Sequence, residues 1–201
     1  MNSKEMLNYN DRYAFLLDLL NDDKLIQKKY VGAEIPNYIC SFPPEEVSSY
    51  NEMVDNLAKN LSKKGRRVLK LNMYEIMIEM LKASGDFEDY LEEPSLTHKE
   101  IMEDFEGVLD NDTEFAPKIA SLINENMPDL VLVNGIGEAY PFIRIHTLLE
   151  KLPTLLSRLV PIVVFYPGNY DKVTGSSALQ LFGKLEHKNY YRAFNIFTEV
   201  R

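Results

Sequence analysis

Two apolar runs constrain the fold of this chain more than any other feature. Residues 129–134 read Asp-Leu-Val-Leu-Val-Asn, and residues 160–166 read Val-Pro-Ile-Val-Val-Phe-Tyr. A continuous apolar run without alternation is typical of a strand that is buried on both faces, as in the centre of a parallel sheet. Between the runs, residues 142–149 carry apolar side chains at helical spacing. We therefore predict a strand–helix–strand unit in which Val131 and Val163 lie deep in neighbouring central strands.

The same alternation of strands and helices continues along the rest of the chain. We predict an α/β fold with a largely parallel sheet of about five strands and helices on both faces. Since no linker or internal repeat interrupts the pattern, residues 1–201 are expected to form one domain, with residues 1–33 as a helical N-terminal arm. Further strands are predicted at 35–40, 66–71 and 193–197, and further helices at 45–64 and 74–81.

The composition disfavours several classes of protein. The single cysteine, Cys40, allows no disulfide framework, and His98, His146 and His187 offer no ligand pair at helical spacing. The net charge of −9 disfavours general affinity for nucleic acid. The N-terminus has no signal-peptide pattern, and no apolar run reaches the ~20 residues of a membrane helix. We therefore expect a cytoplasmic protein.

Negative charge is concentrated in residues 86–114, which hold twelve acidic side chains against one basic side chain, Lys99. The remainder of the chain is slightly positive, so the total charge does not exclude a local basic patch. Solvated helix surface is the ordinary interpretation of the acidic segment. A docking face for a basic partner is the alternative.

The turn after the first predicted strand lacks the chemistry of a phosphate-binding loop. Residues 40–46 read Cys-Ser-Phe-Pro-Pro-Glu-Glu, without glycines to surround phosphates or a Lys-Ser/Thr pair for phosphate and Mg²⁺. Any likeness to P-loop NTPases is therefore expected in topology only, and no cofactor is predicted. The sequence Gly135-Ile-Gly137 also fails as a dinucleotide turn, because Tyr140 occupies the position of the third glycine.

A parallel sheet brings the carboxyl ends of its strands to one edge, where ligands of α/β proteins commonly bind. We predict an interaction rim there, with glycines that let another backbone approach and tyrosines that make rigid aromatic contacts. The alternative is that these tyrosines only cover the end of the sheet. The candidate rim residues are Gly135, Gly137, Tyr140, Arg144, His146, Pro167, Gly168, Tyr170 and Asp171, with Ser41, Phe42 and Tyr74 beside them.

Arg144 and His146 lie in the helix that is predicted after the glycine turn. Residues two apart on a helix point about 200° apart around its axis, so these two are not expected to serve one site together. His146 is interpreted as a structural histidine. Tyr190-Tyr191-Arg192 is a separate candidate interaction motif, because tyrosine and arginine dominate the energetics of interfaces. Core aromatics beside an edge strand are the alternative interpretation of that motif.

Several short motifs, in order along the chain from Glu34 onward, resemble the BrxB family of BREX bacteriophage-exclusion systems. The resemblance implies a place in a multi-protein assembly that blocks phage replication, with a PglZ-type protein and a large BrxC-type ATPase among the companions. It implies no catalytic mechanism. The motifs are Glu34-Ile35-Pro36-x-Tyr38-Ile39, Arg67-Val68-Leu69-x-Leu71-Asn72-x-Tyr74, Gly135-x-Gly137-x-x-Tyr140-Pro141-Phe142-x-Arg144-x-His146, Phe165-Tyr166-Pro167-Gly168-x-Tyr170-Asp171, Leu181-Phe182-Gly183 and Asn189-Tyr190-Tyr191-Arg192-Ala193-Phe194.

Two hypotheses of function follow. The first is a non-enzymatic adaptor subunit, with the PglZ-type protein as its most direct partner and the BrxC-type ATPase as a further one. The second is a nucleic-acid- or nucleotide-binding component with a degenerate ATPase-like fold, which would need a basic patch. Such a patch could consist of Arg66, Arg67 and Lys70, or of Lys184, Lys188 and Arg192.

Overall fold

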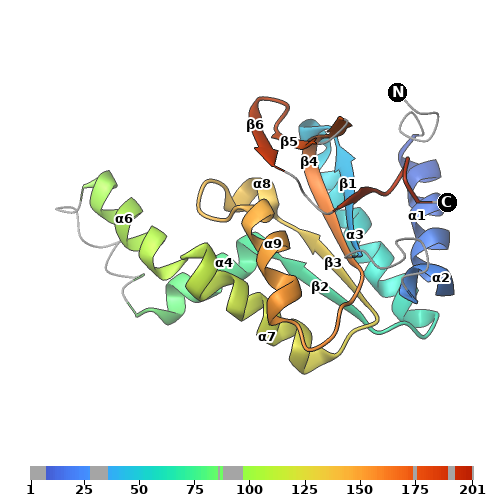
Figure 1. Ribbon diagram of the computed structural model, residues 1–201, viewed down its shortest axis with the longest axis horizontal. Coiled ribbons are helices and arrows are strands. Elements are labelled where there is room, and N and C mark those ends of the chain that lie inside the picture. The colour runs from blue at the N-terminus through green and yellow to red at the C-terminus, as the bar shows by residue number, and fades with distance from the viewer. Residues whose placement is uncertain are drawn as a thin grey trace.

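The computed structural model describes residues 8–27, 36–85, 87, 97–173, 176–189 and 193–200. Five of its strands pair in parallel in the order β2-β3-β4-β1-β7 (Figure 1). Val131 and Val163 are fully buried in the neighbouring strands β3 and β4, which confirms the predicted α/β sheet. The parallel strands are β1 (Asn37–Phe42), β2 (Val68–Asn72), β3 (Leu130–Asn134), β4 (Ile162–Val173) and β7 (Phe194–Asn195).

The strand predicted from the apolar run 160–166 is longer than that run, because Pro167 and Gly168 do not end it. The strand continues to Val173 and pairs antiparallel with β5 (Ser176–Leu181), which pairs with β6 (Leu185–Asn189). Gly168 allows this change of partner, because a Cβ atom there would lie 2.1 Å from the carbonyl oxygen of Gln180. Over the described residues, the sheet therefore contains the two antiparallel strands β5 and β6 in addition to five strands that pair in parallel, as predicted.

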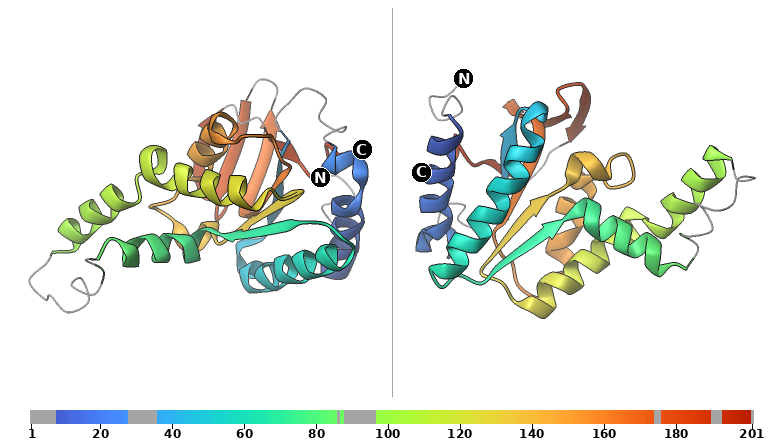
Figure 2. Two further views of the ribbon diagram at one scale, coloured as in Figure 1. Left: turned by 90° about the horizontal axis from the view of Figure 1, so that it is seen from below. Right: turned by 180° about the vertical axis from the view of Figure 1, so that it is seen from behind.

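Helices cover both faces of the sheet, as predicted (Figures 1 and 2). Leu130 and Leu132 of β3 pack on one face with side chains of α1, α2 and α3, whereas Val131 and Val133 pack on the other face with side chains of α4, α7 and α9. Helix α6 projects away from the body beside the end of α4. Among the described residues, no helix is long and apolar enough to span a bilayer. The helices are α1 (Tyr9–Asn21), α2 (Asp23–Ile26), η1 (Pro44–Glu46), α3 (Val47–Lys63), α4 (Met73–Ala83), α6 (His98–Val108), η2 (Asn111–Phe115), α7 (Ala116–Asn126), α8 (Ile136–Ala139) and α9 (Ile145–Leu155).

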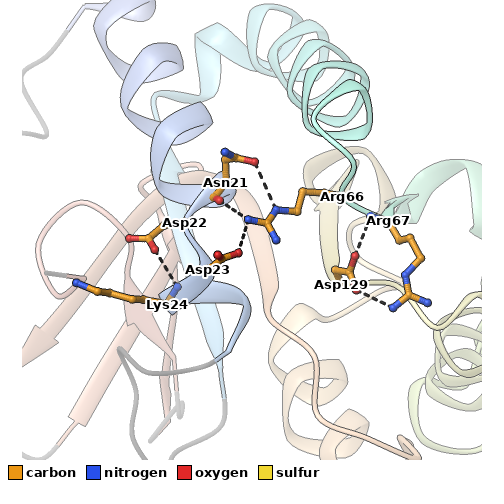
Figure 3. Close-up of polar contacts among 7 residues, drawn as sticks. All are labelled: Asn21, Asp22, Asp23, Lys24, Arg66, Arg67 and Asp129. Carbon is orange, nitrogen blue, oxygen red and sulfur yellow. Dashed lines mark hydrogen bonds and ion pairs between the residues drawn. The ribbon is translucent and has the colours of Figure 1, made fainter.

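Two arginines join the elements at the amino-terminal edge of the parallel strands (Figure 3). The Arg66 guanidinium donates to the carbonyl oxygen of Asn21 and to Asp23, both at 2.6 Å. Arg67 donates to the carboxylate of Asp129 twice, from its backbone N–H at 3.0 Å and from its guanidinium at 2.7 Å. The Arg67 side chain is the largest influence that holds the pKa of Asp129 below its ordinary value. These contacts connect the end of α1 and the start of α2 to β2, and the start of β2 to β3.

We expect Asp129→Asn to destabilise the protein at pH 7, because it removes the negative partner of Arg67. Since folding lowers the pKa of Asp129, its contribution is fully present above the unfolded pKa of about 3.9 and is lost as pH falls through the folded pKa. Urea unfolding should therefore show a stability gap between wild type and D129N at pH 7 that narrows below about pH 4. Glu103→Gln, at the exposed pair with Lys99 on α6, is the control and should change stability little. A gap that stays constant to low pH would contradict this role of Asp129.

Candidate functional site

The carboxyl ends of β1, β2 and β3 lie at the same edge of the sheet as the end of the parallel part of β4, because these strands are parallel. Asn72 ends β2 directly beside Asn134, which ends β3. Pro167 of β4 lies opposite Phe42 at the end of β1. We call this the carboxyl edge; the short helix α8 follows β3 there.

Gly135 fits α8 against the start of α4. It adopts φ +74°, and a Cβ atom there would lie 2.0 Å from Oδ1 of Asn72. That oxygen accepts the backbone N–H groups of Tyr74 at 3.0 Å and Glu75 at 3.3 Å, so it caps the first turn of α4. The space at Gly135 is therefore filled by the chain itself and is not open to the backbone of a partner.

The absence of a side chain at Gly137 lets an aromatic ring from the β5–β6 turn pack against it. A Cβ atom at this position would lie 3.0 Å from Cε1 of Phe182 and 3.1 Å from Cγ of Pro167. The predicted free approach to Gly137 is therefore also taken up from within the chain. The predicted glycine turn includes the helix α8, and the helix expected from the apolar spacing over 142–149 begins at Ile145. The peptide bond between Tyr140 and Pro141 is cis.

Three aromatic side chains around α8 are exposed to solvent, and we call them the aromatic surface: Tyr74, Tyr140 and Phe182. Their exposed fractions are 41%, 36% and 37%. Tyr74 follows the Asn72 cap, Tyr140 ends α8, and Phe182 lies on Gly137. Tyr140 is a predicted rim residue with Tyr74 beside it, whereas Phe182 was present only in the motif Leu181-Phe182-Gly183 and was not predicted as a site residue. An aromatic residue directly before a glycine in a short turn was the available signal.

Tyr170 does not belong to this surface. It is 4% exposed, and its hydroxyl donates to the carbonyl oxygen of Ala193 at 2.8 Å. The neighbouring rim candidates Pro167 and Gly168 are buried as well. Asp171 lies in β4 opposite Ala178, in the part of the strand that pairs with β5. The described positions of Pro167, Gly168 and Tyr170 thus support the architecture of the edge and give a partner no exposed aromatic contact.

Arg144 and His146 border the same small cavity, contrary to the expectation that their spacing would separate them. Arg144 is the N-cap of α9 with extended backbone (φ −112°, ψ 105°), so the helical angle between residues two apart does not apply. Asn111 holds the loop in place: its side chain donates to the carbonyl of Phe142 at 2.7 Å and accepts the N–H of Arg144 at 2.9 Å. The cavity, of about 20 Å³, is otherwise walled by Ile136, Tyr140, Ile143, Ile145, Tyr166, Leu179 and Leu181.

Arg144 also borders a larger cavity, of about 280 Å³, whose lining includes residues of the acidic segment. Glu106, Asp110 and Asp112 contribute carboxylates to its wall. The backbone N–H of Thr113 is the main cause that lowers the pKa of Asp110, so this carboxylate stays charged below its usual range. Lys151 pairs with Asp112 at 3.4 Å. Whether the acidic segment docks a basic partner stays a prediction.

A polar chain connects α3 to α8 at the carboxyl edge. The side-chain N–H of Asn134 donates to Oδ1 of Asn51 at 2.8 Å, and the side-chain N–H of Asn51 donates to Oε1 of Glu138 at 3.1 Å. Because a carboxylate only accepts, Glu138 sets the direction of both bonds. Asn134 is 3% exposed, and its Oδ1 finds no hydrogen-bond partner among the described residues. These two hydrogen bonds hold α8 in position, and with it Tyr140.

Aromatic packing occupies the β1–α3 turn, where a phosphate loop would stand. Phe42 stacks on Tyr50 with ring centroids 4.1 Å apart, and burial raises the pKa of the Tyr50 hydroxyl to about 12. Cys40 is fully buried in β1, and burial likewise raises its thiol pKa to about 12. A thiol that remains protonated in the core is a poor nucleophile, as its place in an apolar strand predicts.

The first basic patch of the nucleic-acid hypothesis is neutralised within the chain. Arg66 pairs with Asp23 and Arg67 with Asp129 (Figure 3), and Lys70 pairs with Asp55 at 2.6 Å. In the second patch, Lys184 is exposed, whereas the side chain of Lys188 and the whole of Arg192 lie outside the described residues. The interaction motif Tyr190-Tyr191-Arg192 also lies outside them, so its role stays a prediction.

The fold and the site together define a class of protein: an α/β chain with an aromatic surface at the carboxyl edge of a mostly parallel sheet. Over the described residues, no group of three or more His, Cys, Asp or Glu side chains could hold a metal ion. The family described as "BREX protein BrxB" matches residues 69–196. The chain therefore belongs to the BrxB family of BREX phage-defence systems, and the resemblance found in its motifs is confirmed.

Two curated relatives are similar over nearly the whole chain. One from Bacillus cereus (strain H3081.97), described as "BREX protein BrxB", is 29% identical over 96% of this chain and all of its own. One from Escherichia coli O9:H4 (strain HS), with the same description, is 28% identical over 94% of this chain and 92% of its own. No solved structure matches the chain, so the likeness of its topology to P-loop NTPases stays a prediction.

We expect Tyr170→Ala to lower the free energy of unfolding by about 3 kcal/mol, because it leaves a cavity where a buried ring stood. Tyr170→Phe keeps the ring and removes only the bond to the carbonyl of Ala193, so its cost should be about 1 kcal/mol. Chemical denaturation of the two variants beside wild type measures both effects. A Tyr170→Ala protein as stable as wild type would contradict the buried position of this side chain.

We expect no strong binding of duplex DNA through Arg66, Arg67 and Lys70, because carboxylates of the chain already neutralise them. Fluorescence anisotropy of a labelled duplex, recorded between about 50 and 200 mM salt, should show the same behaviour for wild type and for the Arg67→Ala, Lys70→Ala double variant. Affinity that falls steeply with salt in the wild type and is lost in the double variant would restore the nucleic-acid hypothesis.

Proposed function

We propose that this protein is a non-enzymatic adaptor subunit of a BREX anti-phage assembly, and that it binds a PglZ-type companion through the aromatic surface. The observation that carries the proposal is that Tyr74, Tyr140 and Phe182 are each more than one-third exposed and that each lies next to α8 or its N-cap. Large aromatic side chains contribute most to the energetics of protein interfaces. Membership of the BrxB family supports a partner from the same BREX system.

The architecture of the carboxyl edge favours an interaction over chemistry. The two glycines that would admit a ligand are filled by Asn72 and Phe182 of the same chain. The turn at the end of β1 holds a stacked aromatic pair and two glutamates, Glu45 and Glu46, instead of phosphate-binding groups. A surface held on rigid strand ends and a capped helix can bind a partner with little loss of conformational freedom.

Tyr140→Ala tests the proposal. Cells that carry the whole neighbouring operon should yield a stable complex of the wild-type protein with the PglZ-type companion. Tyr140→Ala should lower the recovered companion by roughly tenfold, because it removes a rigid aromatic contact. Its melting temperature should stay within about 3 °C of wild type, since the ring is partly exposed and closes only a small cavity.

Leu155→Ala is the matched control. Leu155 is 38% exposed, close to the 36% of Tyr140, and it lies at the end of α9, away from α8. This variant should retain the companion at the wild-type level. If the wild type recovers no PglZ-type protein, the proposed partner is wrong. If Tyr140→Ala retains full binding per folded molecule, the tyrosine only covers the end of the sheet. Recovery of the BrxC-type ATPase in the same experiment would extend the assembly by one subunit.

A further inference from the structure

We propose that Phe182 is the anchor of the partner interface, and that it inserts into an apolar pocket of the companion that has a carboxylate beside it to pair with Lys184. The inference rests on the proposed function and deepens it, because it names the contact residue and the chemistry of the partner. It follows from the backbone conformation, the packing and the surroundings of the β5–β6 turn.

The backbone conformation of the β5–β6 turn favours a residue other than phenylalanine at position 182. Phe182 and Gly183 adopt φ +54° and +68°, and the N–H of Lys184 donates to the carbonyl of Leu181 at 3.1 Å. A hairpin turn with two positive φ angles favours asparagine, aspartate or glycine at both central positions. A bulky residue in this region of φ is a rare outlier. The backbone conformation of the turn therefore disfavours phenylalanine at position 182. We attribute its presence to the role of its side chain.

The Phe182 side chain packs against the protein on one side and is exposed to solvent on the other. The N–H of Phe182 donates to the carbonyl of Pro167 at 3.0 Å, and the ring lies against the bare Cα of Gly137. The remaining 37% of the residue faces solvent beside α8. A ring fixed by one edge and exposed by the other loses little freedom on binding, which is a property of interface anchors. Strain at an exposed residue is a recurrent mark of functional positions.

Met127 shows the same conformation with an ordinary structural cause. It has φ +46° and is 42% exposed, but it follows the last turn of α7 as the left-handed cap that commonly ends a helix. Its cap N–H donates to the carbonyl of Ile123. Met127 lies at the opposite edge of the sheet, before the start of β3. It is therefore a matched control for Phe182 in backbone strain and exposure.

Lys184 defines the second half of the partner's chemistry. It is exposed two residues after Phe182, and no described residue forms an ion pair with it. A partner that covers the ring would also cover this ammonium group. Charge complementarity then requires a carboxylate at the border of the apolar pocket.

Photo-cross-linking tests the anchor directly. The protein would carry p-benzoylphenylalanine in place of Phe182 or, as the control, of Met127, in cells with the complete operon. We expect a cross-link from position 182 to the PglZ-type companion and none from position 127. A cross-link from 182 to a different BREX protein would keep the anchor and replace the proposed partner. Recovery of the PglZ-type companion by wild type without any cross-link from 182 would overturn the anchor and leave the adaptor role intact.

Substitutions measure the strength of the contact. Phe182→Asn suits the turn but removes the ring, and should lower recovery of the companion by roughly tenfold or more at temperatures where the variant is folded. Met127→Asn relieves the same strain and should change recovery by less than about twofold. Lys184→Glu should weaken the complex several-fold, and less so as salt is raised. Recovery with Phe182→Asn within about twofold of wild type would refute the anchor.

Discussion

The burial of β3 on both faces is the constraint on which the rest of the structure depends. Leu130 and Leu132 pack with one set of helices, and Val131 and Val133 pack with the other. Because no water reaches this strand, its backbone groups must pair with strands on both sides, which β2 and β4 provide in parallel. Parallel strands need crossover connections, and the helices of these connections cover the two faces. The three layers thus follow from one apolar run.

The ends of these strands decide where the polar and aromatic groups lie. Asn72 leaves the sheet as the cap of α4, and Gly135 leaves room for that cap. Asn134 is buried and joins Asn51 and Glu138, so α8 is held between two polar contacts. With α8 in place, Tyr140 ends at the surface and Gly137 faces the β5–β6 turn. The aromatic surface is therefore a consequence of how the strands end.

Local sequence predicted the elements better than it predicted the exposure of single residues. The buried strand β3 and the burial of Cys40 could both be predicted, because each depends on neighbours in sequence. Tyr170 was assigned to the interaction rim because a proline and a glycine suggested that β4 ends before it. The strand instead continues, and the carbonyl of Ala193 receives the Tyr170 hydroxyl. Arg144 was placed inside a helix that begins only at Ile145.

The sequence by itself determined the α/β class, the order of the central elements and membership of the BrxB family, since periodicity, turn residues and motifs are local properties. Only the tertiary structure decided which side chains reach solvent at the carboxyl edge. Phe182 lies 45 residues after Gly137, and the contact between them exists only because β4 carries the β5–β6 turn back over α8. Likewise, the pairing of Arg67 with Asp129 removes a basic patch that is evident in the sequence. Contacts between residues distant in the chain have no local pattern in the sequence. In this protein they decide which side chains are exposed or unpaired at the surface.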